Sequence, residues 1–161
     1  MDIILTSVGT VRSTRLDPTD DFWDNEEAYL ELGDEFSEES LYGLSEFSHL
    51  ELIYFLDKVN PQNVVTEARH PRDRVDWPLV GIFSQRGKNR PNRLGLTVCK
   101  ILKIDHKKIF VSGLDAVDGS PIIDIKPYAK EFAPRGETSQ PEWMSQLMRN
   151  YWRESGNNNP L

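Results

Sequence analysis

Short apolar runs separated by turn-forming residues dominate the second half of this sequence. The runs cover residues 94–104, 109–114 and 122–125, and the turn residues lie at 105–108 and 118–121. The second turn reads Asp-Gly-Ser-Pro, which combines residue types that favour tight turns. Short strands joined by such turns are typical of antiparallel barrels and sandwiches. The pattern therefore predicts a mainly β fold built around a meander.

The first half of the chain adds two predicted strands and a short helix. Residues 3–8 are a candidate first strand, and Leu50–Leu56 is predicted to be a buried strand. Ser37 has the character of a helix N-cap, and two glutamates follow it near the positive end of the helix dipole. The next apolar residues fall on one helical face: Leu41, Leu44 and Phe47. We therefore expect a short central helix.

The clearest helical pattern covers residues 139–152. Ser139 is placed to cap this helix, Glu142 would complete a capping box, and Pro141 would lie in the first turn. One face is apolar: Trp143, Met144, Leu147, Met148, Tyr151 and Trp152. This face would either pack on the sheet or form a subunit interface. The domain is therefore expected to span residues 1–152, with a flexible tail at 153–161.

The segment Val80–Ile101 carries an unusual concentration of positive charge. An apolar run leads in, a second leads out from Leu94, and turn residues separate them, which predicts a strand, a turn and a strand. The turn holds four cations: Arg86, Lys88, Arg90 and Arg93. Like charges at this spacing repel, so an anion would stabilise the loop. A solvated hairpin tip without a ligand is the alternative.

Charge is divided unevenly along the chain, whose formal net charge is −7. Residues 1–57 hold fifteen Asp and Glu against two Arg, whereas residues 69–93 hold seven Arg and Lys against two Asp. The acidic part lacks the ligand order of an EF-hand. Within it, Trp23 would serve either as a packing anchor or as a ligand contact. Such a bipolar chain can still present a basic face to nucleic acid.

Several chemistries are excluded by missing motifs. The chain has no Gly-x-Gly-x-x-Gly after a strand and no Walker motif, which argues against a Rossmann cofactor site and a P-loop. Cys99 is the only cysteine, so an internal disulfide and a multi-cysteine zinc site are excluded. The three histidines are scattered and give no metal-ligand spacing. We expect no metal site, and the sequence gives little support for nucleophilic catalysis.

The expected location is cytoplasmic. The N-terminus lacks the basic stretch and apolar core of a signal peptide. No run of about 18 apolar residues occurs, so no membrane span is expected. A hydrophobic content of 38% over 161 residues is that of one soluble globular domain.

Four segments together carry a resemblance to a known family. They are GLSEFSHLELIYF at 43–55, HPR at 70–72, GIFSQRGKNRPNRLGLT at 81–97 and LDAVDGSPIIDIKPY at 114–128. The chain resembles the TsaA-like family, which includes TrmO, the S-adenosylmethionine-dependent methyltransferase of threonylcarbamoyl-adenosine in tRNA. The resemblance runs from about residue 8 to residue 128. It implies a β-barrel methyltransferase and a homodimer that binds the cofactor near the subunit contact.

The resemblance also implies a set of cofactor-binding residues. Arg86 matches the family's cofactor-binding arginine, and Asp57 stands where other members often have His. The remaining matches are Leu56, Leu96, Ser112, Gly113, Leu114 and Asp115, with Trp23 and Asp24 in a loosely aligned N-terminal turn. Physical chemistry agrees, since Arg can grip the cofactor's carboxylate with two hydrogen bonds and a carboxylate such as Asp115 suits its ribose. In-line methyl transfer depends mainly on positioning.

Other polar residues are expected to hold the methyl acceptor. They are Arg69, Arg72, Lys88, Arg90, Asn92, Arg93, Lys126 and Tyr128. The cations among them would either contact acceptor phosphates or remain solvated surface charges. Three functions stay open: a methyltransferase acting on a modified adenosine of tRNA or a related small acceptor, a non-catalytic module that senses the cofactor or an RNA, and an RNA-interacting barrel without a cofactor.

Overall fold

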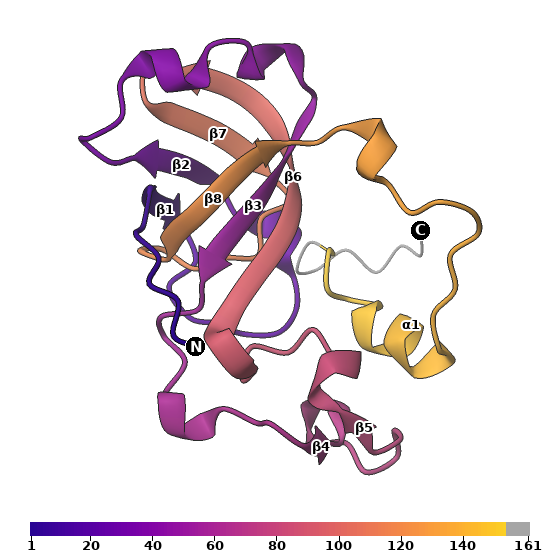
Figure 1. Ribbon diagram of the computed structural model, residues 1–161. Helices are drawn as coiled ribbons and strands as arrows, with labels where there is room; N and C mark the ends of the chain where they lie inside the picture. Colours follow the sequence, from indigo (N-terminus) through magenta and orange to yellow (C-terminus); the bar gives the residue numbers. More distant parts are fainter. Residues whose placement is uncertain (154–161) are drawn as a thin grey trace.

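A closed barrel of six antiparallel strands forms the body of the protein, in the order β1-β2-β7-β6-β3-β8 (Figure 1). The computed structural model describes residues 1–153, apart from the side chain of Asn25. The strands are β1 Gly9–Ser13, β2 Ala28–Leu32, β3 His49–Phe55, β6 Leu94–Asp105, β7 Lys108–Ser112 and β8 Pro121–Pro127. The predicted mainly β, barrel-like class is therefore confirmed. The predicted meander is correct only for the hairpin of β6 and β7, because β8 pairs with β1 and β3 and not with β7.

Alternating burial along the strands fills the barrel interior. In β3, Leu50, Leu52 and Tyr54 face inward, while the residues between them are partly exposed. This alternation is what an antiparallel strand with one covered face requires. The strand predicted at 50–56 is thus confirmed, but only one of its faces is buried. Buried residues of the other strands complete the core: Val11, Leu30, Cys99, Ile109, Val111 and Ile122.

The twelve residues of β6 make this strand the longest wall of the barrel. Its first half pairs with β3 and its second half pairs with β7, with a register shift between Ile101 and Lys103. Such a shift lets one strand bend and serve two neighbours. At the other end, Gly95 pairs with Tyr54, and a Cβ at this glycine would lie 2.2 Å from the tyrosine ring. A glycine is therefore needed for Tyr54 to lie across β6.

The hairpin predicted within Val80–Ile101 does not form. The strand β5, Val80–Gly81, pairs instead with β4, Ala68–Arg69, in a separate two-stranded sheet below the barrel (Figure 1). The buried amide of Gln85 joins this sheet to the following loop, because its Nε2 donates to the carbonyls of Arg69 and Val80, both at 3.0 Å. The prediction was wrong because β6 finds its partners in β3 and β7.

The first predicted strand is also displaced. Residues 1–8 form no strand, and Ile3, Ile4 and Leu5 are exposed. Pairing begins at Gly9, where the backbones of β1 and β2 approach so closely that a Cβ would lie 2.4 Å from the carbonyl of Glu31. The apolar residues at positions 3–5 therefore led to a misplaced strand, because pairing with the neighbouring strands β2 and β8 begins only at Gly9.

Single turns of 3-10 helix replace the predicted central helix. Glu38–Leu41 (η2) and Leu44–Glu46 (η3) are separated by Gly43, whose φ is +80°. Ser37 makes no side-chain capping bond. A left-handed residue between the two turns prevents one continuous helix. The other 3-10 turns are η1 Trp23–Asn25, η4 Pro61–Asn63, η5 Pro71–Asp73, η6 Ile82–Ser84, η7 Pro91–Arg93 and η8 Lys130–Phe132.

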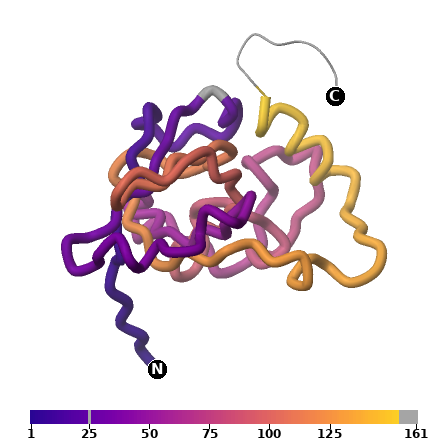
Figure 2. The backbone as a smooth tube through the Cα atoms, turned by 90° about the horizontal axis from the view of Figure 1, so that it is seen from above, coloured from indigo at the N-terminus to yellow at the C-terminus, as the bar shows by residue number. Residues whose placement is uncertain are grey.

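The only α-helix of the described residues is α1, Glu142–Met148, which is shorter than predicted. Pro141 occupies the N-cap position and no side chain caps the helix, so the capping box predicted at Ser139 and Glu142 is wrong. The segment after β8 runs along the outside of the molecule and carries α1 away from the barrel to the side of β4 and β5 (Figures 1 and 2). The predicted tail, apart from Arg153, lies outside the described residues. Within residues 1–153, no helix has the length and apolar character needed to cross a membrane.

Candidate functional site

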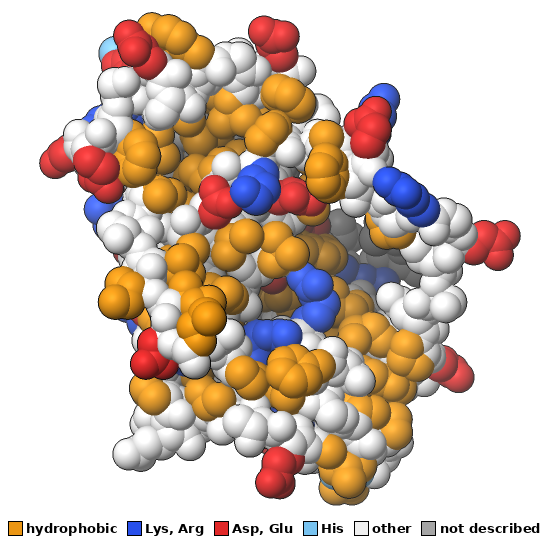
Figure 3. All heavy atoms as spheres, viewed as in Figure 1, with side chains coloured by type: hydrophobic (Ala, Val, Ile, Leu, Met, Phe, Trp, Pro, Cys, Tyr) orange, Lys and Arg blue, Asp and Glu red, His pale blue; other side chains and the backbone are white. Residues whose placement is uncertain are grey.

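A cavity of about 1190 Å³ lies between one flank of the barrel, the loop at residues 18–24, the basic loop at residues 86–93 and α1. Figure 3 shows this hollow near the centre of the face, with cationic side chains beside apolar ones. Residues from both ends of the chain meet here, since residues 18–24 and 143–152 both line the cavity and are hydrogen-bonded to each other at Trp23 and Tyr151. The cavity is large enough for a ligand of nucleotide size together with a second small group.

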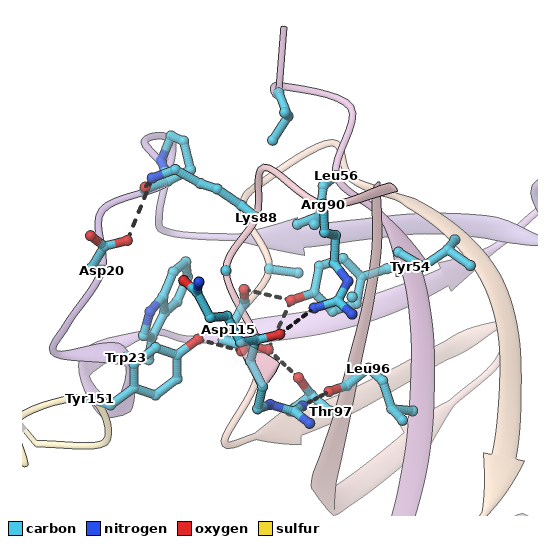
Figure 4. A pocket seen from close by; sticks show the side chains of 18 of the residues that line it. Asp20, Trp23, Tyr54, Leu56, Lys88, Arg90, Leu96, Thr97, Asp115 and Tyr151 are labelled. Atoms are coloured by element: carbon cyan, nitrogen blue, oxygen red, sulfur yellow. Dashed lines mark hydrogen bonds and ion pairs between the residues drawn. The ribbon is translucent and has the colours of Figure 1, made fainter. Parts of the chain in front are cut away.

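The carboxylate of Asp115 is bonded by three side-chain hydroxyls in the cavity (Figure 4). Its Oδ1 accepts a hydrogen bond from the hydroxyl of Thr97 and shares the hydroxyl proton of Tyr54, which lies 3.0 Å from Oδ1 and 2.9 Å from the backbone carbonyl of Asp115. Its Oδ2 accepts a bond of 2.6 Å from the hydroxyl of Tyr151. Asp115 follows β7 in the sequence, and its neighbours Leu114 and Ala116 are buried in the core. This alternation anchors the segment and leaves the carboxylate directed at the cavity.

Burial raises the pKa of Tyr54 and that of Tyr151, and the negative charge of Asp115 raises both pKa values further. Both phenols therefore stay protonated and act as donors. Burial, followed by the charge of Asp115, likewise raises the pKa of the Cys99 thiol to about 12. This thiol is therefore protonated at neutral pH, which makes it a poor nucleophile.

Trp23 forms an aromatic part of the cavity wall. Its side chain is only 5% exposed, with the guanidinium of Arg15 4.0 Å from the ring centroid and the Tyr151 ring 6.5 Å away. The backbone N–H of Trp23 donates to the carbonyl of Tyr151 at 2.9 Å. Its indole Nε1 is buried and has no hydrogen-bond partner among the described residues. Trp23 is thus a packing anchor that also faces the cavity.

Some of the cations at the cavity are already paired with the acidic N-terminal segment. Arg72 makes two hydrogen bonds to the carboxylate of Asp21, at 2.8 and 2.9 Å. Lys88 lies 3.5 Å from Asp20 and donates to the carbonyl of Pro18 at 2.7 Å (Figure 4). The repulsion predicted within the basic segment is therefore partly relieved by the protein's own carboxylates.

Two other arginines at the cavity are bonded to backbone carbonyls. Arg86 donates from Nη2 to the carbonyl of Leu96 at 2.7 Å, and Arg90 donates from Nη1 to that of Gln85 at 2.8 Å. A carbonyl holds a guanidinium in place without cancelling its charge. These two side chains are therefore the ones best prepared to bind an anionic ligand.

Comparison with known proteins assigns the chain to a family. A family profile described as the tRNA-methyltransferase O N-terminal domain matches residues 17–133. The chain belongs to this family. The resemblance inferred from the sequence motifs is therefore confirmed. An S-adenosyl-L-methionine-binding protein of Archaeoglobus fulgidus is 31% identical over 134 residues, which cover 80% of this chain and 91% of that protein.

Longer relatives and a solved structure extend the comparison of this TrmO-family domain. The tRNA (adenine(37)-N6)-methyltransferase of Mus musculus is 38% identical over 95 residues, 59% of this chain and 22% of that protein. The chain thus spans about a fifth of the length of its mammalian relatives. The crystal structure of TrmO from Pseudomonas aeruginosa superposes with a TM-score of 0.70 at 24% identity, covering 86% of this chain and 61% of that one, which shows a shared fold.

The cavity gathers most of the cofactor residues expected for a TrmO-family domain. Those that line it are Trp23, Asp24, Leu56, Asp57, Arg86, Leu96, Gly113 and Asp115. Ser112 and Leu114 do not line it. Ser112 ends β7 and pairs with Lys100 of β6, while the Leu114 side chain is turned into the core and is only 2% exposed. Consecutive residues point to opposite sides here, which a contiguous motif does not reveal.

The expected acceptor residues are divided between the cavity and the outer surface. Arg72, Lys88, Arg90 and Asn92 line the cavity, whereas Arg69, Arg93, Lys126 and Tyr128 do not. Arg69 pairs with Asp73 at 2.8 Å, and Arg93 donates to the carbonyl of Val59 at 2.9 Å while lying over the Phe55 ring. Lys126 pairs with Asp124 at 2.5 Å. Arg69, Arg93 and Lys126 are therefore engaged in local contacts outside the cavity lining.

Three residues that hold Asp115 were not identified from the sequence. Tyr54 and Thr97 sit at inward positions of β3 and β6, so strand alternation could have placed them beside the core but not beside Asp115. Tyr151 was assigned to a helix face that would pack on the sheet or form an interface. The face lines the cavity instead. The position of Tyr151 depends on the long connection between β8 and α1 and on contacts with residues 22 and 23.

The raised tyrosine pKa values predict a loss of stability at alkaline pH. The folded protein keeps the Tyr54 proton at pH values where the unfolded chain releases it, so this contribution is complete below pH ~10 and declines above it. In Tyr54→Phe, the free energy of unfolding should fall less steeply between pH 9.5 and 11, by up to about 1.4 kcal/mol per pH unit. Urea unfolding across this range measures the slope.

The matched control is Tyr42→Phe, because Tyr42 is 78% exposed and its hydroxyl lies outside the cavity. This variant should retain the wild-type slope. Equal slopes for the wild-type protein and Tyr54→Phe would contradict the account of a protonated, buried Tyr54.

Proposed function

We propose that this protein binds S-adenosylmethionine in the cavity around Asp115 and transfers its methyl group to an adenosine of tRNA, a threonylcarbamoyl-modified one as the motif resemblance implies. The observation that supports this most directly is that eight residues matched to cofactor contacts, distributed from Trp23 to Asp115, line one cavity. Relatives named for S-adenosylmethionine binding and for methylation of adenine 37 in tRNA support the same proposal.

The unpaired polar atoms of the cavity fit such a cofactor. Buried Nε1 of Trp23 is a donor without a partner and buried Oδ1 of Asp57 is an acceptor without one, among the described residues. Arg86 is held by one carbonyl and offers further N–H groups to a carboxylate. Together these residues supply a donor, an acceptor and a cation, which match an adenosyl group bearing an amino acid.

In the proposed reaction, the cofactor supplies an electrophilic methyl group on a positively charged sulfur. The protein's contribution is positioning. Arg86 would orient the carboxylate end, and Asp115, held by three hydroxyls, would accept a hydrogen bond from the ribose of the adenosyl group. The apolar wall from Leu96 to α1 would exclude water. A covalent nucleophile is not needed, which agrees with the buried, protonated Cys99.

The acceptor would enter past the basic loop. Arg90 and Asn92 line the cavity on this side, and Lys88 lies beside them with Asp20 as its partner. A cation that is held by neutral carbonyls can contact phosphate without first losing an ion pair. Arg90 is therefore the residue proposed for the acceptor's backbone, with Lys88 and Arg72 available once Asp20 and Asp21 move away.

A non-catalytic S-adenosylmethionine-binding module is the second candidate. It is favoured by the relatives that match over nearly their whole length, because the A. fulgidus protein is named only for binding this compound. The relatives named as tRNA methyltransferases are about five times longer than the matched region. An additional domain in those proteins could serve tRNA recognition.

Mass spectrometry of tRNA separates the two candidates. Purified protein with labelled S-adenosylmethionine should add one methyl group to an adenosine of tRNA isolated from a deletion strain. Tight cofactor binding without any methylated nucleoside would support the binding module. Methylation of the same tRNA by Arg86→Ala at the wild-type rate would contradict the proposed site.

Arg86 is the most direct test of cofactor binding. Arg86→Ala should weaken the binding of S-adenosylmethionine about tenfold to a hundredfold. Arg86→Lys should weaken binding as well, because Lys cannot form two parallel hydrogen bonds to a carboxylate. S-adenosylhomocysteine keeps the carboxylate, so its binding should weaken by the same factor. Isothermal titration calorimetry measures both ligands.

Arg12→Ala is a suitable control, since Arg12 pairs with Glu31 on the outer barrel wall and does not line the cavity. It should bind both ligands as tightly as the wild-type protein. Unchanged affinity in Arg86→Ala would show that the arginine does not bind the carboxylate.

A homodimer in the cytoplasm is the proposed state of the working protein. The apolar face of α1 lines the cavity, and so do Leu96 and Val98 of β6, so an interface at either surface would lie beside the proposed cofactor site. The outer face of β6 is suitable, because Leu96, Val98 and Leu102 are 49%, 46% and 58% exposed. A tRNA substrate would be met in the cytoplasm.

Light scattering at micromolar concentration should give twice the monomer mass of 18.6 kDa. Leu102→Glu should shift the protein towards monomer, because a charge at a buried apolar contact is costly to desolvate. A wild-type monomer would contradict the proposed dimer, and a dimer unaffected by Leu102→Glu would place its interface on another surface.

A further inference from the structure

The C-terminal segment forms one wall of the cavity although it lies outside the family match. The family profile ends at residue 133, whereas α1 and the turn after it occupy residues 142–153. Six apolar side chains of this segment line the cavity: Trp143, Met144, Leu147, Met148, Tyr151 and Trp152. The site of this chain therefore includes a part that family membership does not describe.

Specific hydrogen bonds hold this segment against the rest of the cavity. The indole Nε1 of Trp77 donates to the side-chain carbonyl of Gln146 at 3.0 Å. The N–H of Phe22 donates to the carbonyl of Asn150 at 3.0 Å, and that of Trp23 donates to the carbonyl of Tyr151 at 2.9 Å. Tyr151 is thus fixed through its backbone by the N-terminal loop and through its hydroxyl by Asp115.

We infer that Tyr151 is a positioning residue that fixes the orientation of the Asp115 carboxylate for ligand binding. Tyr54 and Thr97 both donate to Oδ1 of this carboxylate, whereas Tyr151 donates to Oδ2. Because the carboxylate is tethered at Cβ, two donors on Oδ1 restrain its rotation about the Cβ–Cγ bond from one side only. A donor on the second oxygen fixes its plane.

This role rests on the proposed function, because it assumes that the fixed carboxylate contacts the ligand. Asp115 and Tyr151 both line the cavity, and they lie beside each other and near Trp23 (Figure 4). Since partial burial and the charge of Asp115 raise the pKa of Tyr151, its hydroxyl remains a donor throughout the neutral range. The contact therefore couples docking of the C-terminal segment to the geometry of the site.

The variant that tests this role is Tyr151→Phe, which removes the hydroxyl and keeps the ring. Its affinity for S-adenosylhomocysteine, measured by calorimetry, should fall about fivefold to tenfold, which is less than the full effect of losing a hydrogen bond to a charged group, because the variant removes a bond to Asp115 and not a bond to the ligand. Tyr29→Phe is the matched control, because Tyr29 packs on Phe110 outside the cavity. It should bind as the wild-type protein does.

A second measurement reports on the contact without any ligand. The ¹³C signal of the Asp115 side-chain carboxyl, assigned by its loss in Asp115→Asn, should shift in Tyr151→Phe and stay in place in Tyr29→Phe. A tyrosine that only fills space would not move this signal, because Phe fills the same space.

The outcomes are distinct. A shifted carboxyl signal together with weaker binding supports the inference. An unchanged signal overturns the contact, and a shifted signal with wild-type affinity overturns the positioning role. If the wild-type protein does not bind S-adenosylhomocysteine, the proposed function fails and the positioning role fails with it, while the carboxyl signal still reports whether Tyr151 holds Asp115.

Discussion

The hydrogen bonds to the Asp115 carboxylate join parts of the structure that lie far apart in the sequence. Tyr54 comes from β3, Thr97 from β6 and Tyr151 from the segment after α1. A partly buried carboxylate is stable only when its oxygens have donors, so the barrel and the C-terminal segment depend on each other here. Gly95 contributes indirectly, since its missing side chain makes room for the Tyr54 ring. The cavity is built around this one charged group.

The uneven charge of the sequence has a structural explanation. The acidic N-terminal part folds back on the basic loops, where Asp21 binds Arg72 and Asp20 approaches Lys88. Exposed pairs of this kind add little stability, but they lower the repulsion among neighbouring cations. They also separate the cations into two groups. Arg86 and Arg90, which are bonded to carbonyls, keep an uncompensated charge at the cavity.

Local chemistry predicted the fold where neighbouring strands are joined by short turns. The hairpin of β6 and β7 was predictable because residues 105–108 are turn-forming and lie between two apolar runs. The crossing from β7 to β8 was not, since β8 pairs with β1 and β3. The pairing of Val80–Gly81 with Ala68–Arg69 was not, since nothing local distinguishes it from a hairpin with β6. Likewise, motif matching selected eight residues that line one cavity but also included Leu114, whose direction is set by the core. Tyr151 could not be predicted, because its position depends on the long connection after β8 and on contacts with residues 22 and 23.

The central claim is that the cavity around Asp115 is a binding site for S-adenosylmethionine. A crystal structure of the protein grown with S-adenosylhomocysteine tests it most directly. The account predicts density for the ligand within the cavity, with its carboxylate at Arg86 and with Trp23 and Asp115 in contact with the adenosyl group. Density for the ligand at another place, or a cavity that stays free of ligand at saturating concentration, would contradict it.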